Sequence, residues 1–228
     1  MKTHSLTGIT GGIKNLFGCL IGPYKAQMHL RMQRQRDFAA MLADLSLAIQ
    51  PVLYIIDGVI GMEGNGPRNG NPINTGVIIA GTNGFAVDMV MAKIMGFDAK
   101  RLPVTAWAIE HKLVSEPAAL EVVGSAATVV VPYKAPKNLA ALDAKIPGWL
   151  AKAGQRQLTA KPVVNDRCVG CGRCAAHCPP SAINIEQGKA VINYGKCIRC
   201  YCCQELCPYD AIELKESVVL KLIKRLYF

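Results

Sequence analysis

Two cysteine runs, CVGCGRCAAHCP at residues 168–179 and CIRCYCCQELCP at residues 197–208, decide the fold of their part of the chain. Both have the spacing C-x2-C-x2-C-x3-C-P, and a shift of 29 residues superposes all four cysteines and the proline. The repeat extends beyond the cysteines, because Ala182 falls on Ala211 under the same shift. We therefore predict a duplicated half-domain whose two copies surround a pseudo-twofold axis.

The residues around these runs predict a small α+β unit. Four short strands are expected, at residues 162–165, 182–186, 190–193 and 211–214. Gln187 and Gly188 are expected to turn the middle hairpin. The fourth cysteine of each run is expected to start a short helix and to point away from the first three.

The spacing is typical of bacterial ferredoxins with two 4Fe-4S clusters, in which the fourth cysteine of each run binds the other cluster. Residues 160–216 closely resemble such a domain. Three thiolates two residues apart in a tight loop are placed to reach three irons of one cube. We expect one cluster to be held by Cys168, Cys171, Cys174 and Cys207, and the other by Cys197, Cys200, Cys203 and Cys178.

Two other roles for the cysteines are weighed against this one. Zinc also binds cysteines at C-x2-C spacing, but it needs only four ligands per site and does not require the third cysteine or the proline. Nine of the ten cysteines fall between Cys168 and Cys207, and the chain shows no export signal, which disfavours disulfides. Cys202 is read as a spare cysteine beside the ligands, and Cys19 as a buried small apolar residue.

The composition bounds the class of protein. The chain has 228 residues, of which 51% are hydrophobic, so it is large enough for one domain and a smaller second one. Its apolar runs are far shorter than a bilayer requires, and we expect a cytoplasmic protein without a transmembrane span. The net charge of +10 is spread evenly and contains no block of like charges, so a nucleic-acid partner is not expected.

The patterns before the cysteines predict an α/β domain with a mostly parallel sheet at residues 1–135. Helical spacing at residues 24–49 involves Phe38, Met41, Leu42, Leu45 and Ile49, and further helices are expected at residues 84–96 and 103–114. Strands are expected at residues 52–57, 75–81, 119–123 and 127–133. A helical linker at residues 136–160 leads to the 161–216 domain, and a basic amphipathic tail follows at residues 217–228.

A glycine-rich stretch, DGVIGMEGNGPRNGNP at residues 57–72, follows the first buried strand of this domain. It matches neither a P-loop nor the G-x-G-x-x-G pattern, so no nucleotide is implied. Ligands of parallel α/β sheets lie beyond the carboxyl ends of the strands, where we expect this loop. The candidate catalytic residues are therefore Asp57, Glu63 and Asn65.

Four motifs in order resemble the second half of the family called domain of unknown function 362: LTGITGGIKNLFG, K-x3-H at Lys25 to His29, the glycine-rich stretch, and AVDMVMAKIMG. The resemblance covers roughly residues 2–115, and family members are often iron–sulfur proteins with a two-cluster ferredoxin module. It implies ligand contacts at Asp88, at the three catalytic candidates, and at the cofactor-binding candidates Lys14, Asn15, Lys25 and His29. Taken singly, Lys25 and His29 also fit a solvated helix face, Asp57 a strand-end cap and Asp88 a helix N-terminal acid.

Members of that family usually carry a long segment before the residues that match KTHSLTG. The α/β domain is therefore expected to be incomplete relative to the family: a fragment, a shortened form, or a domain completed by another subunit or oligomer.

Two functions follow as hypotheses. In the first, the chain is an oxidoreductase component that moves electrons between its clusters, a redox partner protein and a small molecule bound at the α/β domain. In the second, it is a non-catalytic electron carrier, or an iron–sulfur scaffold or maturation protein, that binds a partner through the α/β domain. The tail is expected to pack on the chain itself or to contact a membrane surface.

Overall fold

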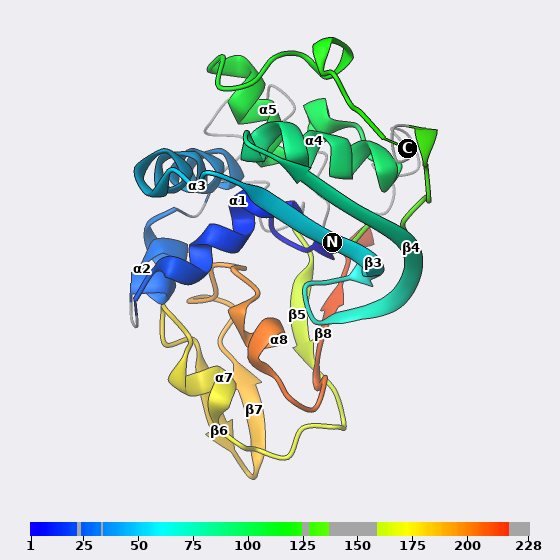
Figure 1. The fold of residues 1–228 in the computed structure, drawn as a ribbon. Coiled ribbons are helices and arrows are strands. Elements are labelled where there is room, and N and C mark those ends of the chain that lie inside the picture. The colour runs from blue at the N-terminus through cyan, green and yellow to red at the C-terminus, as the bar shows by residue number, and fades with distance from the viewer. Residues whose placement is uncertain (22–23, 33, 125–127, 137–158, 219–228) are drawn as a thin grey trace. The chain divides into compact units, whose positions relative to one another are not determined.

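The computed structural model describes residues 1–21, 24–32, 34–124, 128–136 and 159–218 (Figure 1). The chain divides into two compact units: unit 1 comprises Met1–Lys25 and Arg34–Pro136, and unit 2 comprises Ala26–Gln33 and Lys137–Phe228. The predicted linker at 136–160 and the predicted tail at 217–228 lie outside the described residues, apart from residues 136, 159–160 and 217–218. Within the described part of the chain, no helix has the length and apolar character needed to span a bilayer.

Unit 1 is built on a mixed four-stranded sheet of order β2-β1-β3-β4. Its strands are β1 (Lys2–His4), β2 (Gly8–Thr10), β3 (Tyr54–Asn65) and β4 (Asn69–Gly81). β1 is parallel to β3, whereas β1 pairs with β2 and β3 with β4 in antiparallel fashion. The prediction of a mostly parallel sheet is therefore wrong. The cause is local, because β3 and β4 are joined by three residues, and so short a connection joins only antiparallel strands.

The glycine-rich stretch 57–72 is most of this hairpin and is not a loop. From Tyr54 to Gly58, buried and exposed residues alternate, as expected of a strand with one covered face. A bulge between Gly58 and Ile60 shifts the register, and beyond it Glu63 is buried. Polar residues that a loop would place together are thus distributed along a strand.

The helices of unit 1 cover one face of this hairpin (Figure 1). The chain forms α1 (Gly12–Asn15), η1 (Leu16–Cys19), α3 (Gln35–Ile49), α4 (Gly84–Ile94), η2 (Ala99–Arg101), α5 (Pro103–Glu110) and η3 (Pro117–Ala119). The predicted helix at residues 84–96 is confirmed as α4, which Asn83 caps by accepting the N–H groups of Phe85 and Ala86. The helix predicted from residue 103 is confirmed as α5.

The helical pattern at residues 24–49 is two helices, α2 (Tyr24–Arg31) and α3. They are separate because Arg34 has an extended backbone with ψ of 140°. The buried face of α3 carries Phe38 and Leu42 together with small residues, whereas Ile49 is exposed. Phe38 packs edge-on against Phe17 of η1, with ring centroids 5.2 Å apart. Cys19 at the end of η1 is exposed, so the prediction that it is buried is wrong.

The two late strands expected at residues 119–123 and 127–133 are wrong for the described residues of those segments, which form no ladder. Instead, Val131 and Tyr133 donate their N–H groups to the carbonyls of Ile94 and Met95, at 2.7 and 2.9 Å. These carbonyls end helix α4 and have no partner within it. The β-branched residues thus satisfy a helix terminus rather than a sheet.

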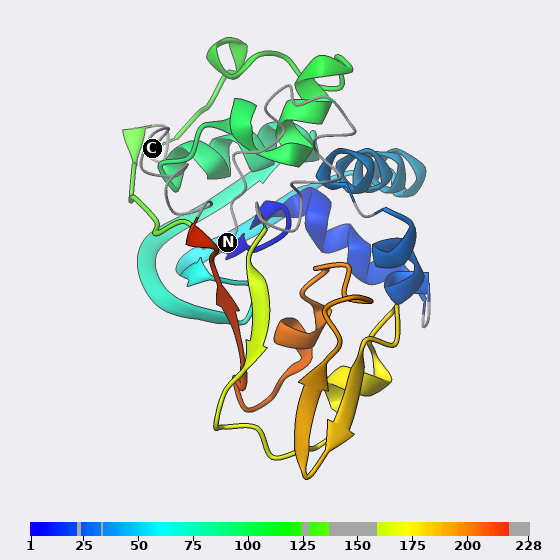
Figure 2. The ribbon, with the colours of Figure 1, turned by 180° about the vertical axis from the view of Figure 1, so that it is seen from behind.

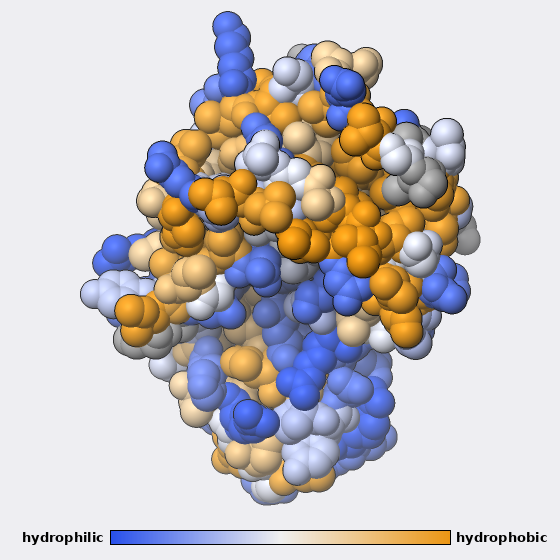
Figure 3. Space-filling model, viewed as in Figure 1, coloured by the Kyte–Doolittle hydropathy of each residue, from blue (hydrophilic) through white to orange (hydrophobic). Residues whose placement is uncertain are grey.

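The other face of the hairpin is apolar and exposed. Ile55, Ile60 and Ile78 are 65%, 68% and 66% exposed. Hydrophobic residues gather over β3 and β4 in the view of Figure 3. Monomeric proteins rarely leave an apolar patch of this kind uncovered.

Unit 2 contains two small antiparallel sheets (Figure 2). β5 (Lys161–Val164) pairs with β8 (Ile212–Lys215), and β6 (Ile183–Glu186) pairs with β7 (Lys189–Ile192). The four predicted strands are confirmed to within a residue at each end. Gln187 and Gly188 turn the hairpin with φ of 47° and 73°, as predicted.

Two short helices of unit 2, α7 (Arg173–Ala176) and α8 (Cys202–Leu206), each contain the third cysteine of a run. The expectation that the fourth cysteine starts a helix is wrong, because Cys178 and Cys207 follow α7 and α8. The third cysteine lies in the helix and the fourth lies just beyond its end. The prolines that follow these cysteines prevent the helices from continuing.

Candidate metal centres

Two cavities of about 330 and 340 Å³ lie in unit 2, and each is lined by four cysteines of the repeated pattern. Cavity 1 is lined by Cys168, Cys171, Cys174 and Cys207. Cavity 2 is lined by Cys178, Cys197, Cys200 and Cys203, and Cys202 also reaches it. Each cavity therefore receives three cysteines from one run and the fourth from the other run.

Backbone N–H groups point at several of these sulfurs. Ala190 and Ala211 donate to Cys168 and Cys207 of cavity 1, at 3.4 and 3.2 Å. Ala182 donates to Cys178 of cavity 2 at 3.2 Å. Such bonds stabilise negative charge on a thiolate and are among the factors that set the potential of an iron–sulfur cluster.

Burial has the opposite effect to these hydrogen bonds, because it disfavours the thiolate form of the metal-free cysteines. It raises the pKa of the Cys174, Cys178 and Cys203 thiols, because a thiolate loses solvation inside the unit. A hydrogen bond between Cys200 and Cys202 lowers the pKa of Cys200 and raises that of Cys202. A positive metal ion removes this cost, because a coordinating thiol is deprotonated outright.

The cysteine arrangement does not suit a single ion. Zinc in a structural site draws its ligands to about 2.3 Å from one point. Across the residues that the structure describes, no group of three His, Cys, Asp or Glu side chains is placed to hold one metal ion. Four cysteines arranged around one cavity, rather than around one point, instead fit a larger metal group.

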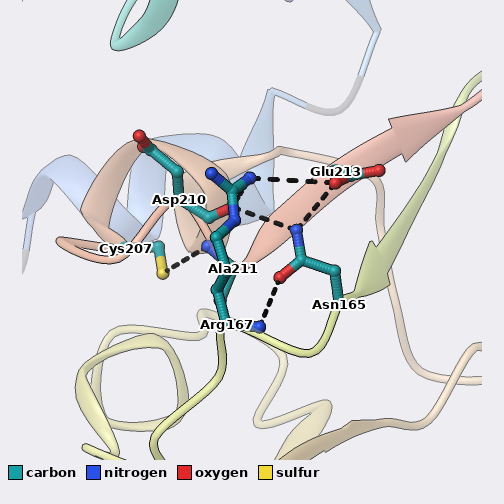
Figure 4. A network of polar contacts seen from close by, with 6 residues as sticks. All are labelled: Asn165, Arg167, Cys207, Asp210, Ala211 and Glu213. Carbon is teal, nitrogen blue, oxygen red and sulfur yellow. Dashed lines mark hydrogen bonds and ion pairs between the residues drawn. The ribbon is translucent and has the colours of Figure 1, made fainter.

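A network of hydrogen bonds and one ion pair joins the two chain segments that flank the cysteines of cavity 1 (Figure 4). Asn165 donates to Glu213 at 2.7 Å and accepts the N–H of Arg167 at 3.0 Å. The Arg167 guanidinium donates to the carbonyl of Asp210 at 2.6 Å and lies 3.8 Å from Glu213. The network thus ties the residues just before Cys168 to those just after Cys207. No local pattern signals this network, because its partners lie 43 to 48 residues apart in the chain.

The three catalytic candidates of unit 1 do not meet in one place. Asp57 is exposed and accepts the N–H of Val59 at 2.9 Å. Glu63 is buried, accepts the backbone N–H of Lys134 at 2.9 Å, and lies 3.3 Å from its ammonium group. The Lys134 N–H lowers the pKa of Glu63, which holds a chain segment in place. Asn65 lies at the end of β3 opposite Asn69, and a catalytic role for these residues stays a prediction.

The cofactor-binding candidates are dispersed as well. The ammonium groups of Lys14 and Lys25 lie 4.7 and 5.5 Å from the centre of the Phe17 ring, as in cation–π pairs. His29 is buried in α2, and Asn15 is exposed at the end of α1. Their part in cofactor binding stays a prediction.

Asp88 is fully buried in the second turn of α4 and so is not an acid at the start of its own helix. Its carboxylate accepts the N–H groups of Gly12 and Ile13, at 2.6 and 3.2 Å. Burial raises its pKa to about 7. Asp88 therefore caps α1 from another helix, and a Cβ at Gly11, the residue before α1, would overlap the Asp88 carboxylate.

One open groove of about 1140 Å³ in unit 1 does bring two candidates together. Asn15 and Asp57 both line it, together with Gly11, Gly12, Ile55 and Ile60, among others. A groove with polar groups in an apolar wall is the usual form of a small-molecule site.

The comparisons with known proteins bear on both units. The family model described as "Domain of unknown function (DUF362)" matches residues 1–93, and the model described as "4Fe-4S dicluster domain" matches residues 161–208. Both resemblances inferred from the sequence are confirmed, and the second match indicates that unit 2 binds 4Fe-4S clusters. A thylakoid-associated protein of Synechocystis is 34% identical over 148 residues, which cover 64% of this chain and 43% of the relative. The chain thus spans less than half the length of the curated relative that it matches.

Proposed function

We propose that unit 2 holds two 4Fe-4S clusters and that the chain transfers electrons to or from a substrate or cofactor bound at unit 1. The observation that carries this proposal is the pair of cavities, each lined by four cysteines from both copies of the repeat. Clusters bound there supply reversible one-electron transfer. The cysteines of cavity 1 hold the first cluster and those of cavity 2, without Cys202, hold the second.

The surrounding residues suit this role. The N–H groups of Ala182, Ala190 and Ala211 offset charge on the ligand sulfurs, and apolar side chains of the unit pack against several of the ligand cysteines. Because each cluster takes a ligand from the other run, the two clusters share one scaffold and stay close. This favours electron transfer between them.

The test is iron and sulfide analysis after anaerobic purification. We expect about eight irons per chain and broad visible absorption. Cys171→Ser is expected to lower the iron content, whereas the matched variant Cys202→Ser is expected to retain it. Stoichiometric zinc in place of iron, or an equal loss of iron in both variants, would overturn the assignment.

The groove of unit 1 is the proposed place of the small molecule, with Asp57 and Asn15 in contact with it. A ligand there is expected to co-purify with the anaerobic chain and to be detected by mass spectrometry. Asp57→Asn and Asn15→Ala should lower its amount without loss of iron, whereas the exposed-carboxylate control Asp44→Asn should not. Retention of the ligand in both variants would remove the groove from the proposal.

A second candidate function is favoured by the apolar outer face of the β3–β4 hairpin. Here the chain is a non-catalytic electron carrier or iron–sulfur scaffold, and a partner polypeptide covers Ile55, Ile60 and Ile78 and completes the α/β layer. Absence of any bound small molecule, together with a stable stoichiometric complex that Ile55→Lys abolishes, would favour this function over the first.

The compartment is also a proposal. We place the chain in the cytoplasm, and the thylakoid association of the relative together with the net charge of +10 supports contact with an anionic membrane surface. The tail at residues 217–228 is the proposed contact. Flotation with anionic vesicles of the full chain, compared with Lys221→Glu/Lys224→Glu, tests this.

A further inference from the structure

The two cavities have equivalent cysteines but unequal walls. Six residues that line cavity 1 are exposed: Val169, Cys171, Arg173, Ile185, Pro208 and Tyr209. Every residue that lines cavity 2 is buried or half-buried. The difference is one of accessibility to solvent, and solvent exposure is one of the factors that set the potential of an iron–sulfur cluster.

Comparison of the repeats locates part of this difference in single residues. Gly172 of the first copy corresponds to Tyr201 of the second. The Tyr201 ring is 2% exposed and its hydroxyl donates to the carbonyl of Ala160 at 3.0 Å, so an anchored aromatic ring covers the wall of cavity 2. Cavity 1 has no side chain at the corresponding position.

The side-chain charges of the two cysteine runs also differ, and the first run is the more positive. Arg173 is exposed and lines cavity 1, and the equivalent position in cavity 2 is the neutral Cys202. The second run contains Glu205 as well as Arg199, and the charge of Glu205 reaches the Cys200 and Cys202 thiols. The first run contains no acidic residue. The ligand run of copy 1 is therefore more positive by one charge.

Hydrogen bonding to the ligand sulfurs does not separate the two cavities. In cavity 1 the sulfurs of Cys168 and Cys207 accept backbone N–H groups, and in cavity 2 those of Cys178 and Cys200 do so. A cluster becomes more negative by one charge when it is reduced. Nearby positive charge, N–H donors and water all stabilise that reduced form, and each of them raises the potential.

We infer that the two clusters have different reduction potentials, with the cluster of cavity 1 at the higher potential, and that Arg173 and Glu205 contribute to the difference from opposite sides. This inference rests on the proposed function, since it presupposes that both cavities are filled. The first electron added to the chain then resides on the solvent-facing cluster of cavity 1, where an external redox partner is able to reach it.

The test is a redox titration of the intact chain with sodium dithionite, followed by electron paramagnetic resonance. Each cluster takes up one electron from dithionite, and no bond is formed or broken. We expect two one-electron steps whose equilibrium constants differ at least tenfold, which corresponds to about 59 mV.

Two substitutions that each remove one charge assign the steps. Arg173→Gln is expected to lower the potential of the higher step, and Glu205→Gln to raise that of the lower step, each leaving the other step in place. Lys215→Gln on β8 lines neither cavity and is the control, expected to move neither step.

The outcomes separate this inference from the function on which it rests. Eight irons per chain with two coincident steps, or a shift of the lower step in Arg173→Gln, would overturn the inference and leave the clusters in place. Loss of iron from the wild-type chain would overturn both.

Discussion

Asp88 is the residue whose chemistry departs most from its ordinary state in unit 1. It has no solvent contact, and two backbone N–H groups at the start of α1 point at its carboxylate. These bonds favour the charged form, while burial favours the neutral form and prevails, which puts the pKa at about 7. The carboxyl group therefore changes charge near neutral pH inside the fold.

This predicts a pH-dependent stability. The folded-state pKa of about 7 lies above the ordinary value of 3.8, so the folded chain binds the extra proton between those values. The contribution of Asp88 to the free energy of unfolding is then largest below about pH 4 and falls as the pH rises to 7, by a few kcal/mol at about 1.4 kcal/mol per pKa unit. Urea unfolding of the wild type and of Asp88→Asn, followed by tryptophan fluorescence, should give a stability difference that changes across this window.

The exposed-carboxylate variant Asp44→Asn is the control, and its difference from the wild type should stay flat. A flat difference for Asp88→Asn as well would contradict the assignment of a protonated, buried Asp88.

At the scale of elements, the β3–β4 hairpin depends on close contacts that only glycine permits. A Cβ at Gly61 would overlap the hydroxyl of Tyr133, whose oxygen lies 2.5 Å from the Thr75 hydroxyl. Tyr133 in turn bonds through its backbone to the end of α4. The glycine therefore lets the hairpin and the helix end share one tyrosine.

A double-mutant cycle tests this contact. Gly61→Ala is expected to lower the free energy of unfolding, because the new methyl group displaces the Tyr133 ring. Tyr133→Phe removes the overlapping oxygen, so the double variant should lose less stability than the two single losses combined, with a coupling of roughly 1 kcal/mol. Additive losses, measured by chemical unfolding, would show that the two residues do not meet.

The sequence predicted elements well where the signal is local. Short segments of sequence are enough to predict the turn at Gln187 and Gly188 and the helix from Gly84, and both are found as expected. The cysteine spacing is a local signal of the same kind. The direction of the sheet was missed because the glycines at 57–72 indicated a loop. Instead Gly61 within β3 lies against Tyr133, and Gly66 in the turn lies against Thr3, contacts that no local pattern reveals.

The candidate site of unit 1 was harder to predict for the same reason. Glu63 accepts a hydrogen bond from Lys134, and Asp88 accepts one from Gly12, partners that are 71 and 76 residues away in the chain. A carboxylate in a glycine-rich stretch indicates catalysis as readily as it indicates a structural tie. The long-range contact gives Glu63 a structural partner in Lys134, and its catalytic role stays a prediction.

At the scale of the whole molecule, the apolar outer face of the hairpin predicts association of the isolated chain. Ile55 and Ile78 are each about two-thirds exposed, and Ile78 stands opposite Asp57 across the ladder. Ile55→Lys/Ile78→Lys should weaken self-association at least tenfold, about 1.4 kcal/mol. Stability should be kept, because a lysine opposite Asp57 makes a favourable cross-strand pair.

The measurement is light scattering of the chain as a function of its concentration. Val123→Lys, at an exposed position away from the strands, is the control. Association that is unchanged by the double substitution would show that the face is not adhesive and would remove the main support for a partner that covers it.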